Sequence, residues 1–483
     1  MADRLRRIPS ALGALLAVST LLVLLWACLT PAFQAPDEQR HFSYVESIGA
    51  RFALPGEKGR PPTSTQLSEG MEAVNADIVA GQRAVKPEWS DGFERRWLAT
   101  QQRAARDDGG GPSPSSGYPP TAYAWQALGY AAGSGGTLFD ELLGARLMSA
   151  LWLPITVLGT WLLAGEVLGR RRLLQTAATA PAALAPMVAF ITASVSPDGM
   201  LYAIWALALW LGVRCVKRGV PARDAVAFFA LVGLACTIKT VSYALLPVAV
   251  FVAVLGVAAR RPWRVSRLLR YAAVVAVPLA LTLGVWVLAA RIGERAAAPS
   301  LAQATVSSPG TNWRELLSYV WQYYLPRTPM QSDYRIPPGG YPLLQVWITQ
   351  GWGAFGWLEI KFSPWVYRVA GLLTAGIGLG AAVALVRARR VVDARVAGFV
   401  GLAFLSLLAG LHWTDYHELE RGSIGFMQAR YMFPVIGILG LAVAGAVSLV
   451  PAAWRAAATG AVVAGLLVFH VFALGLVIER FYA

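Results

Sequence analysis

Residues Ala11–Leu29 (ALGALLAVSTLLVLLWACL) decide the fold class of this chain. The run of 19 residues carries no charge, and a helix needs about 20 apolar residues to cross the hydrocarbon core of a bilayer. The whole chain of 483 residues is 56% hydrophobic and only 14% charged, whereas soluble domains carry about 25% charged residues. This composition excludes an ordinary soluble enzyme and a disordered scaffold, and it indicates an integral membrane protein.

Ten further apolar runs follow the first, so we expect about eleven transmembrane segments. Helices are predicted because backbone N–H and C=O groups inside a bilayer must be paired within the segment. The fourth and fifth runs are short, so three interpretations stay open for them: tilted helices, broken helices or a re-entrant pair. The predicted fold is an all-α polytopic membrane protein with spans at Ala11–Leu29, Leu142–Leu168, Leu173–Ala193, Met200–Val213, Ala225–Cys236, Val241–Val257, Tyr271–Ala290, Val366–Val386, Val396–Leu411, Tyr431–Val450 and Ala456–Ile478.

Basic residues mark one set of loops. The formal net charge is +15, and the arginines and lysines lie between the apolar runs rather than in one patch. Because these basic segments alternate with the spans, the positive-inside rule places them in the cytoplasm. The N-terminus, Arg264 and Arg389 are therefore expected inside, and the C-terminus, Ser300 and Tyr334 outside. The charge is an orientation signal, so nucleic acid is not predicted as a partner.

The N-terminal segment also resembles a signal peptide, because arginines precede an apolar run that ends near Cys28. The run is longer than the usual ~7–15 residues, and Trp26 is an unfavourable neighbour for lipid attachment to Cys28. An uncleaved anchor is therefore favoured. Cys28, Cys215 and Cys236 all lie in or beside apolar runs, so no disulfide framework is expected.

Two long stretches rich in Pro, Gly, Ser and charge fall on the predicted external face, and loops of this length are usually functional or disordered. We expect short interfacial helices in them, such as Tyr118–Tyr130, and an outer aromatic belt around Trp347–Trp365. The predicted organisation is residues 1–29 (cytoplasmic N-terminus and first span), 30–141 (first external loop), 142–290 (spans two to seven), 291–365 (second external loop) and 366–483 (spans eight to eleven).

The most informative polar cluster is Pro36-Asp37-Glu38-Gln39-Arg40-His41, just outside the first span. Pro36 suits the first helical position, and acidic residues are favoured in the first turn by the helix dipole. Asp37 and His41 are four residues apart, on one helical face. A carboxylate there can act as a general base or electrostatic stabiliser that His41 orients. The alternative interpretation is a capped helix start with a solvated charge cluster.

Other ionisable residues are predicted at the same membrane face. Asp198 lies between the third and fourth spans, Lys239 follows the fifth, and Arg430 opens the tenth. Ionisable residues at membrane depth are costly and suggest function. The alternatives are a helix N-cap for Asp198 and snorkelling for Lys239 and Arg430, although the positive-inside rule puts excess cations on the other side.

Together these residues would place carboxylates next to Arg40, Lys239 and Arg430. Transfer from a lipid phosphate requires cations that hold the phosphate beside a carboxylate that activates a hydroxyl. Asp37, Glu38 and His41 could also ligate a divalent cation, but no His or Cys set has zinc spacing. No metal site and no certain cofactor is predicted.

Eight short motifs run along most of the chain. They are P-D-E-x-x-H at 36–41, Y-P-P-x-x-Y at 118–123, Arg146, S-x-S-P-D-G at 194–199, Thr237–Lys239, Leu325–Arg327, W-G-x-F-G-W at 352–357 and Q-x-R-Y at 428–431. In this order the chain resembles the integral-membrane GT-C glycosyltransferase superfamily, specifically a largely uncharacterised bacterial family of predicted membrane proteins within it. Two positions depart from that pattern: Ala429, where Gly is common, and Ser196, where Asn is frequent.

The resemblance implies a GT-C-like helical bundle in the bacterial inner (cytoplasmic) membrane, with its active site on the periplasmic face under the first loop. It implies hexosyl or pentosyl transfer from a polyprenyl-phosphate donor to a cell-envelope glycan or lipid acceptor, with inversion. By analogy Asp37 is the catalytic carboxylate, Glu38 its neighbour or substitute, and Arg430 and Lys239 phosphate ligands. Further substrate-site candidates are Asp198, Tyr118, Tyr123, Arg327, Gln428 and Tyr431.

Two other functions remain open from the sequence. A transporter or flippase for a lipid-linked sugar would place ionisable residues near the bilayer midplane and show repeat symmetry. Here the carboxylates gather at the predicted outer rim, which favours surface chemistry. A non-catalytic envelope assembly factor, whose large loops bind partners, is the third hypothesis.

Overall fold

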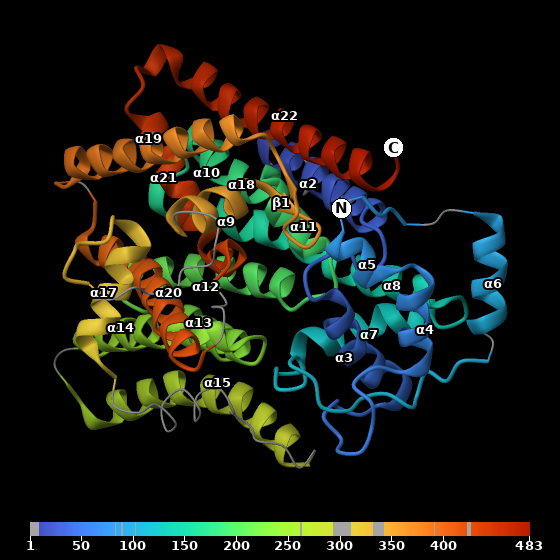
Figure 1. Ribbon diagram of the computed structural model, residues 1–483. Coiled ribbons are helices and arrows are strands. Elements are labelled where there is room, and N and C mark those ends of the chain that lie inside the picture. Colours follow the sequence, from blue (N-terminus) through green and yellow to red (C-terminus); the bar gives the residue numbers. More distant parts are fainter. Residues whose placement is uncertain are drawn as a thin grey trace.

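The computed structural model describes residues 9–82, 84–87, 90–101, 103–260, 263–292, 311–331, 342–390, 392–422 and 427–483. The described chain is almost entirely helical, and its two strands form one short hairpin. Residues 30–141 are called the first polar region and residues 291–365 the second. Figure 1 shows the elements of the first polar region, drawn in blue to teal, gathered at one end of the long helices. They are α3 (Glu38–Arg51), α4 (Thr65–Ala73), α5 (Ala76–Gly81), α6 (Asp91–Gln101) and α7 (Thr121–Gly133).

Nine helices among the described residues are long and apolar enough to cross a membrane. A tenth is formed when α10 (Arg172–Leu184) and α11 (Pro186–Ala193), bent by 47°, count as one span. The bend lies at Ala185, which is extended because proline at the next position disfavours a helical conformation. The nine are α2 (Ser10–Leu29), α8 with α9 (Leu138–Ala150, Trp152–Leu168), α12 (Asp198–Arg218), η1 with α14 (Thr240–Ala244, Leu245–Ala258), α15 (Val265–Ile292), α19 (Pro364–Ala388), α20 (Ala394–Glu420), η3 with α21 (Ala429–Val435, Ile436–Ser448) and η4 with α22 (Ala452–Trp454, Arg455–Phe481).

The predicted fifth span is the helix α13 (Ala222–Cys236), whose 15 residues fall short of the usual spanning length. Ion pairs nevertheless join it to its antiparallel neighbour α12 near both ends. Arg214 Nε lies 2.8 Å from Asp224 Oδ2 at one end, and Lys239 Nζ lies 2.6 Å from Asp198 Oδ1 at the other. The helix α13 and the turn after it thus run beside α12 between these two ion pairs, but α13 is not among the nine or ten candidate spans of the described chain.

The end of α22 lies beside the end of α2. The Tyr482 hydroxyl donates to the Leu29 carbonyl at 3.0 Å, at the end of α2. Arg480 donates to the carbonyls of Val79 and Val85 in the first polar region. The C-terminal ends of α2 and α22 thus lie together, next to the first polar region.

Helix α7 is held close to α8 by two facing glycines. A Cβ atom on Gly129 would lie 2.1 Å from the Gly144 carbonyl oxygen, so any larger residue would push the helices apart. Small residues allow this kind of close helix approach. On its other side α7 meets α3, where the rings of Tyr44 and Tyr123 stack with centroids 4.0 Å apart. These contacts fix the position of α3, which carries the P-D-E-x-x-H motif.

The second polar region contributes α17 (Trp313–Tyr324), the π-helical segment η2 (Leu343–Gln350), α18 (Gly351–Gly353) and the antiparallel strands β1 (Ala354–Phe355) and β2 (Ile360–Lys361). The prediction of an aromatic belt here is wrong for Phe355. Its side chain is fully buried and stacks on Trp26 of α2, with ring centroids 5.0 Å apart. Trp357 donates through its indole N–H to the Phe33 carbonyl. The hairpin therefore packs onto the C-terminal end of α2.

The predicted orientation can be tested by cysteine labelling in a Cys28→Ser background, since Cys28 is exposed and the other two cysteines are buried. Lys58→Cys should react with a membrane-impermeant maleimide in intact cells, whereas Arg389→Cys should react only after permeabilisation. Both positions are exposed, while Ser300 and Tyr334 lie outside the described residues. The reverse labelling pattern would contradict the orientation.

Candidate functional site

Asp37 precedes α3 in a strained backbone conformation. Its φ of 61° and ψ of 11° are left-handed, which is uncommon for a residue other than glycine. Helix α3 begins at Glu38, so the expectation that Pro36 is the first helical residue is wrong. The Asp37 side chain makes no capping hydrogen bond, and the capped-helix interpretation therefore does not describe it. Such strain persists only where the surroundings impose it, and it is concentrated at functional sites.

The Asp37 carboxylate faces Arg430. Arg430 donates through one terminal nitrogen to Asp37 Oδ2 at 2.8 Å, and its Nε has no hydrogen-bond partner in the described structure. Arg40, which is half exposed, lies 3.5 Å from the other oxygen, Asp37 Oδ1. The Asp37 side chain keeps 29% of its surface exposed. It is thus an accessible carboxylate held between two guanidinium groups.

Lys239 lies beside this pair and is itself paired with Asp198. Asp198 is the first residue of α12, and its Oδ2 is buried without a partner among the described residues. The ring of Tyr431 lies against both cations, 4.8 Å from Lys239 Nζ and 5.3 Å from Arg430 Cζ. Lys239 and Arg430 are buried within the protein. The two cations are therefore part of a built cluster, and the snorkelling interpretation does not describe them.

The protonation states follow from burial and from the neighbouring charges. Burial alone would raise the pKa of Asp37, but the Arg430 guanidinium beside it brings that pKa below the usual value. Burial, followed by the Lys239 charge, lowers the pKa of His41 to about 3. At neutral pH the site therefore contains an ionised Asp37 and an uncharged His41.

His41 is oriented by aromatic residues of the first polar region. Its Nδ1 lies 2.8 Å from the Tyr123 hydroxyl, and its ring stacks between Tyr118 and Tyr123. Tyr118 is held by its carbonyl, which accepts from the Tyr44 hydroxyl at 3.0 Å. His41 Nδ1 is thus engaged by Tyr123, which fixes the imidazole in the wall of the site.

Glu38 turns away from this cluster. It is completely buried and forms a two-pronged ion pair with Arg146 of α8, with contacts of 2.8 Å and 2.5 Å. Arg146 also donates to the carbonyls of Ala27, Thr30 and Pro31 at the end of α2. A catalytic or metal-binding role for Glu38 would require this pair to break. We therefore propose that Glu38 is a positioning residue.

Asp37, Glu38 and His41 face three different partners, and no group of three or more His, Cys, Asp or Glu residues within the described ranges could hold a metal ion. Two further predicted site residues differ in where they lie: Arg327 is apart from the cluster, and Gln428 is two residues before Arg430. Arg327 is exposed on the loop after α17, where its Nε donates to the Gln331 carbonyl. Gln428 precedes η3 in an extended conformation, and its Oε1 is buried without a partner in the described chain.

Sequence reasoning missed several residues that hold the cluster. Arg146 was noticed only as part of the resemblance, although a lone arginine inside an apolar run was a signal for a buried carboxylate partner. The Tyr202 hydroxyl donates to the Arg430 carbonyl at 3.0 Å, and Gln350 Oε1 accepts from the Ala429 amide at 3.3 Å. Neither residue stands in a motif, so no sequence signal pointed to it.

Residues 20–439 match the model of a protein family described as predicted membrane protein (DUF2142). The chain belongs to the DUF2142 family. No protein of established function in the curated set matches it. This DUF2142 protein is similar in structure to apo ArnT from Cupriavidus metallidurans, with a TM-score of 0.50 and 15% identity over 98% of this chain and 76% of ArnT.

A second structural relative is the archaeal oligosaccharyltransferase AglB from Archaeoglobus fulgidus. The TM-score is 0.48 and the identity 12%, over 98% of this chain and 56% of AglB. The likeness to ArnT shows the GT-C fold, which confirms the predicted fold class. At these sequence identities the comparison shows similarity of fold alone.

The Glu38–Arg146 pair should be a large contributor to stability. Glu38→Gln leaves a buried arginine uncompensated, so we expect a loss of about 3–5 kcal/mol, with a similar loss for Arg146→Gln. The double variant Glu38→Gln/Arg146→Gln should lose clearly less than the sum, because two neutral amides can hydrogen-bond. Thermal unfolding of the purified protein in detergent measures this, and additive losses in the double variant would contradict the coupling.

Proposed function

We propose that this DUF2142 protein is a GT-C type glycosyltransferase that moves a sugar from a polyprenyl-phosphate donor to a hydroxyl-bearing envelope acceptor, with inversion. The observation that carries the proposal is the accessible carboxylate of Asp37, ion-paired to Arg430 at 2.8 Å. A second buried cation, Lys239, lies across the Tyr431 ring from Arg430. The arrangement pairs a proton acceptor with two cations that can hold a phosphate.

The charge balance of the cluster supports an anionic ligand. Arg40, Lys239 and Arg430 contribute three positive charges, and Asp37 and Asp198 contribute two negative ones, because His41 is neutral and Glu38 is compensated by Arg146. The unpartnered Nε of Arg430 offers a further donor. Arginine binds phosphate through several N–H groups in a fixed geometry. A phosphate bound here would meet a net positive site with unused hydrogen-bond capacity.

The reaction requires a proton acceptor and a stabilised leaving group. The acceptor hydroxyl oxygen would attack the anomeric carbon and transfer its proton to Asp37. The bond between that carbon and the phosphate oxygen would break, and the polyprenyl phosphate would leave with its negative charge held by Arg430 and Lys239. Binding of the donor phosphate next to Arg430 adds a negative charge near Asp37. Such a charge raises the pKa of a carboxyl group, so donor binding would make Asp37 a stronger base.

Two further observations support the donor class and the location. ArnT has been solved bound to undecaprenyl phosphate, and this chain shares its fold. The cations Lys239 and Arg430 lie next to the first residues of helices that are long and apolar enough to span a membrane. With the basic loops in the cytoplasm, the site would face the periplasm from the bacterial inner membrane.

The carboxylates Asp37 and Asp198 gather at one end of the helices, where the polar region covers them. A transporter requires its ionisable residues near the bilayer midplane, so this placement supports surface chemistry over translocation.

Asp37→Asn should abolish transfer while leaving the fold intact. Asparagine is almost isosteric with aspartate and tolerates the left-handed conformation, but it cannot accept the proton. Loss of a positioned general base costs about 10²–10⁴-fold in rate. Donor binding should be retained or become tighter, because Arg430 loses its competing anion. Purified variants would be assayed for turnover against a panel of polyprenyl-phosphate sugars, and wild-type turnover by Asp37→Asn would sink the catalytic assignment.

The phosphate role of Lys239 can be tested with a double variant that leaves no buried charge unpaired, and with a single variant, less stable but still cationic, as its control. In Asp198→Asn/Lys239→Gln both members of the pair become neutral, so the fold should survive while the cation is lost. A charged hydrogen bond is worth about 1.5–3 kcal/mol, so donor affinity should fall roughly tenfold or more. Asp198→Asn alone is the matched control, because it keeps Lys239 and should not weaken binding. Equal donor affinity in wild type and the double variant would contradict a phosphate contact.

A further inference from the structure

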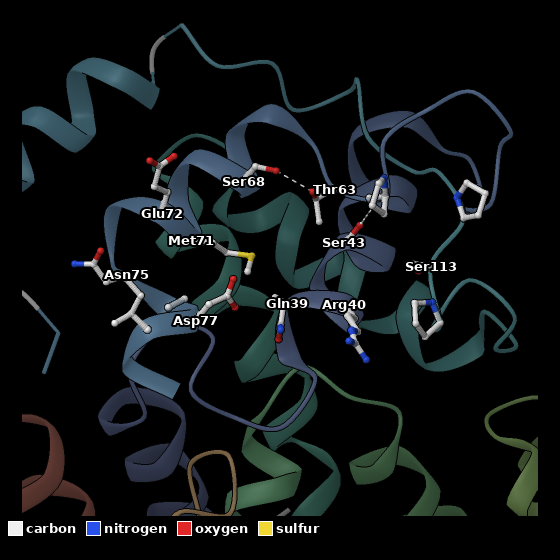
Figure 2. Close-up of a pocket in the computed structure, with 15 residues that line it drawn as sticks. Gln39, Arg40, Ser43, Thr63, Ser68, Met71, Glu72, Asn75, Asp77 and Ser113 are labelled. Atoms are coloured by element: carbon white, nitrogen blue, oxygen red, sulfur yellow. Dashed lines mark hydrogen bonds between the residues drawn. The ribbon is translucent and has the colours of Figure 1, made fainter. Parts of the chain in front are cut away.

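A pocket lies beside α3 within the first polar region. It measures about 670 Å³ and lies between α3, α4, α5 and the loop at residues 112–114 (Figure 2). Ligand pockets commonly measure about 300–1,000 Å³. Every residue that lines the pocket falls between positions 39 and 114, outside the helices long enough to span a membrane. A ligand bound there would therefore come from the aqueous phase.

The lining of the pocket suits a neutral ligand rich in hydroxyl groups. Six apolar side chains, three of them proline, line it beside serine and threonine hydroxyls, two side-chain amides, one cation, Arg40, and two carboxylates, Glu72 and Asp77. The net charge of the lining is negative, which disfavours a phosphate or carboxylate ligand. Hydroxyls and amides both donate and accept hydrogen bonds, so they match the hydroxyl groups of a sugar.

Gln39 provides a specific site for a ligand hydroxyl. Its Oε1 is buried and has no hydrogen-bond partner in the described structure, although the residue lines the pocket. Figure 2 shows the side chains of Gln39 and Arg40 pointing in the same direction, away from Ser68 and Thr63. Because Oε1 is buried and the side chain points away from Ser68 and Thr63, Gln39 would present Oε1 to a ligand in the pocket after a change of side-chain rotamer.

Asp37 connects this pocket with the buried cations. Arg430 lies 2.8 Å from Asp37 Oδ2, on the side of the spanning helices. Arg40, which lines the pocket, lies 3.5 Å from Asp37 Oδ1. The two oxygens of one carboxylate thus have different partners, and Arg40 is the residue that links Asp37 to the lining of the pocket. A group leaving the pocket past Arg40 would meet Oδ1 first.

We propose that this pocket binds a neutral saccharide, the acceptor of the reaction, and directs one of its hydroxyl groups past Arg40 to Asp37 Oδ1. The inference rests on the proposed glycosyltransferase function and names the acceptor class. The acceptor hydroxyl gives its proton to Oδ1 as its oxygen bonds to the anomeric carbon, and the donor phosphate leaves toward Arg430 and Lys239. The lipid-linked donor and the soluble or polymeric acceptor thereby reach Asp37 from opposite sides.

The test uses the full-length protein in nanodiscs and saturation-transfer NMR with the methyl glycosides of glucose, galactose, mannose and arabinose. Methyl glucuronide serves as the anionic comparison. Ser68→Trp fills the pocket from an exposed position on α4, and Ala99→Trp on α6 is the matched control, exposed but outside the pocket lining. Gln39→Leu removes the unpartnered acceptor. Donor binding by polyprenyl-phosphate sugars is measured on the same samples.

We expect at least one neutral glycoside to bind wild type and Ala99→Trp, to lose binding in Ser68→Trp and to bind several-fold more weakly to Gln39→Leu. Donor binding should be equal in all four proteins. Failure of every neutral glycoside, preference for the glucuronide, or full binding by Ser68→Trp would overturn the saccharide pocket. If the donor itself does not bind, or binds independently of Lys239, the proposed function fails, whatever the glycosides do.

Discussion

The buried ion pair between Glu38 and Arg146 is the interaction on which the candidate site depends. It joins the first residue of α3 to α8, and Arg146 extends the contact to three carbonyls at the end of α2. Glu38 Oε1 also accepts from the backbone amide of Val195, just before α12. Buried charges are tolerated only when such bonds satisfy them. Four segments are therefore held together by the Glu38–Arg146 pair, and Asp37 is the residue immediately before Glu38.

This anchoring explains the strained backbone of Asp37. With Glu38 fixed to Arg146, the chain must turn sharply between Pro36 and α3, and Asp37 takes the left-handed conformation at that turn. Its carboxylate then points to Arg430 rather than to the helix N-terminus. The strain orients the one accessible carboxylate of the cluster toward the cations, which is the arrangement that proton transfer beside a bound phosphate requires.

A second constraint comes from the antiparallel pair α12 and α13. Their ion pairs near opposite ends fix the relative depth of the two helices, so Asp198 and Lys239 meet at the end that faces the first polar region. The same polar region supplies Tyr118 and Tyr123 to one wall of the cluster and the hydroxyl-lined pocket on its outer side. Asp37 lies where these two parts of the molecule meet.

The sequence alone determined that the protein is a helical membrane protein, and it singled out the residues Asp37, Asp198, Lys239 and Arg430 that the structure brings together. Hydropathy and charge alternation are local along the chain, and they place each polar residue at one end of a helix whatever its partners are. The pairing was decided only by tertiary structure. Glu38 and Arg146 are 108 residues apart and Asp37 and Arg430 are 393 apart, so no local pattern shows which cation meets which carboxylate. The role of Glu38, the partner of His41 and the pocket beside Gln39 all depend on how α3 packs against α7 and α8, because packing, not spacing, sets which side chains touch.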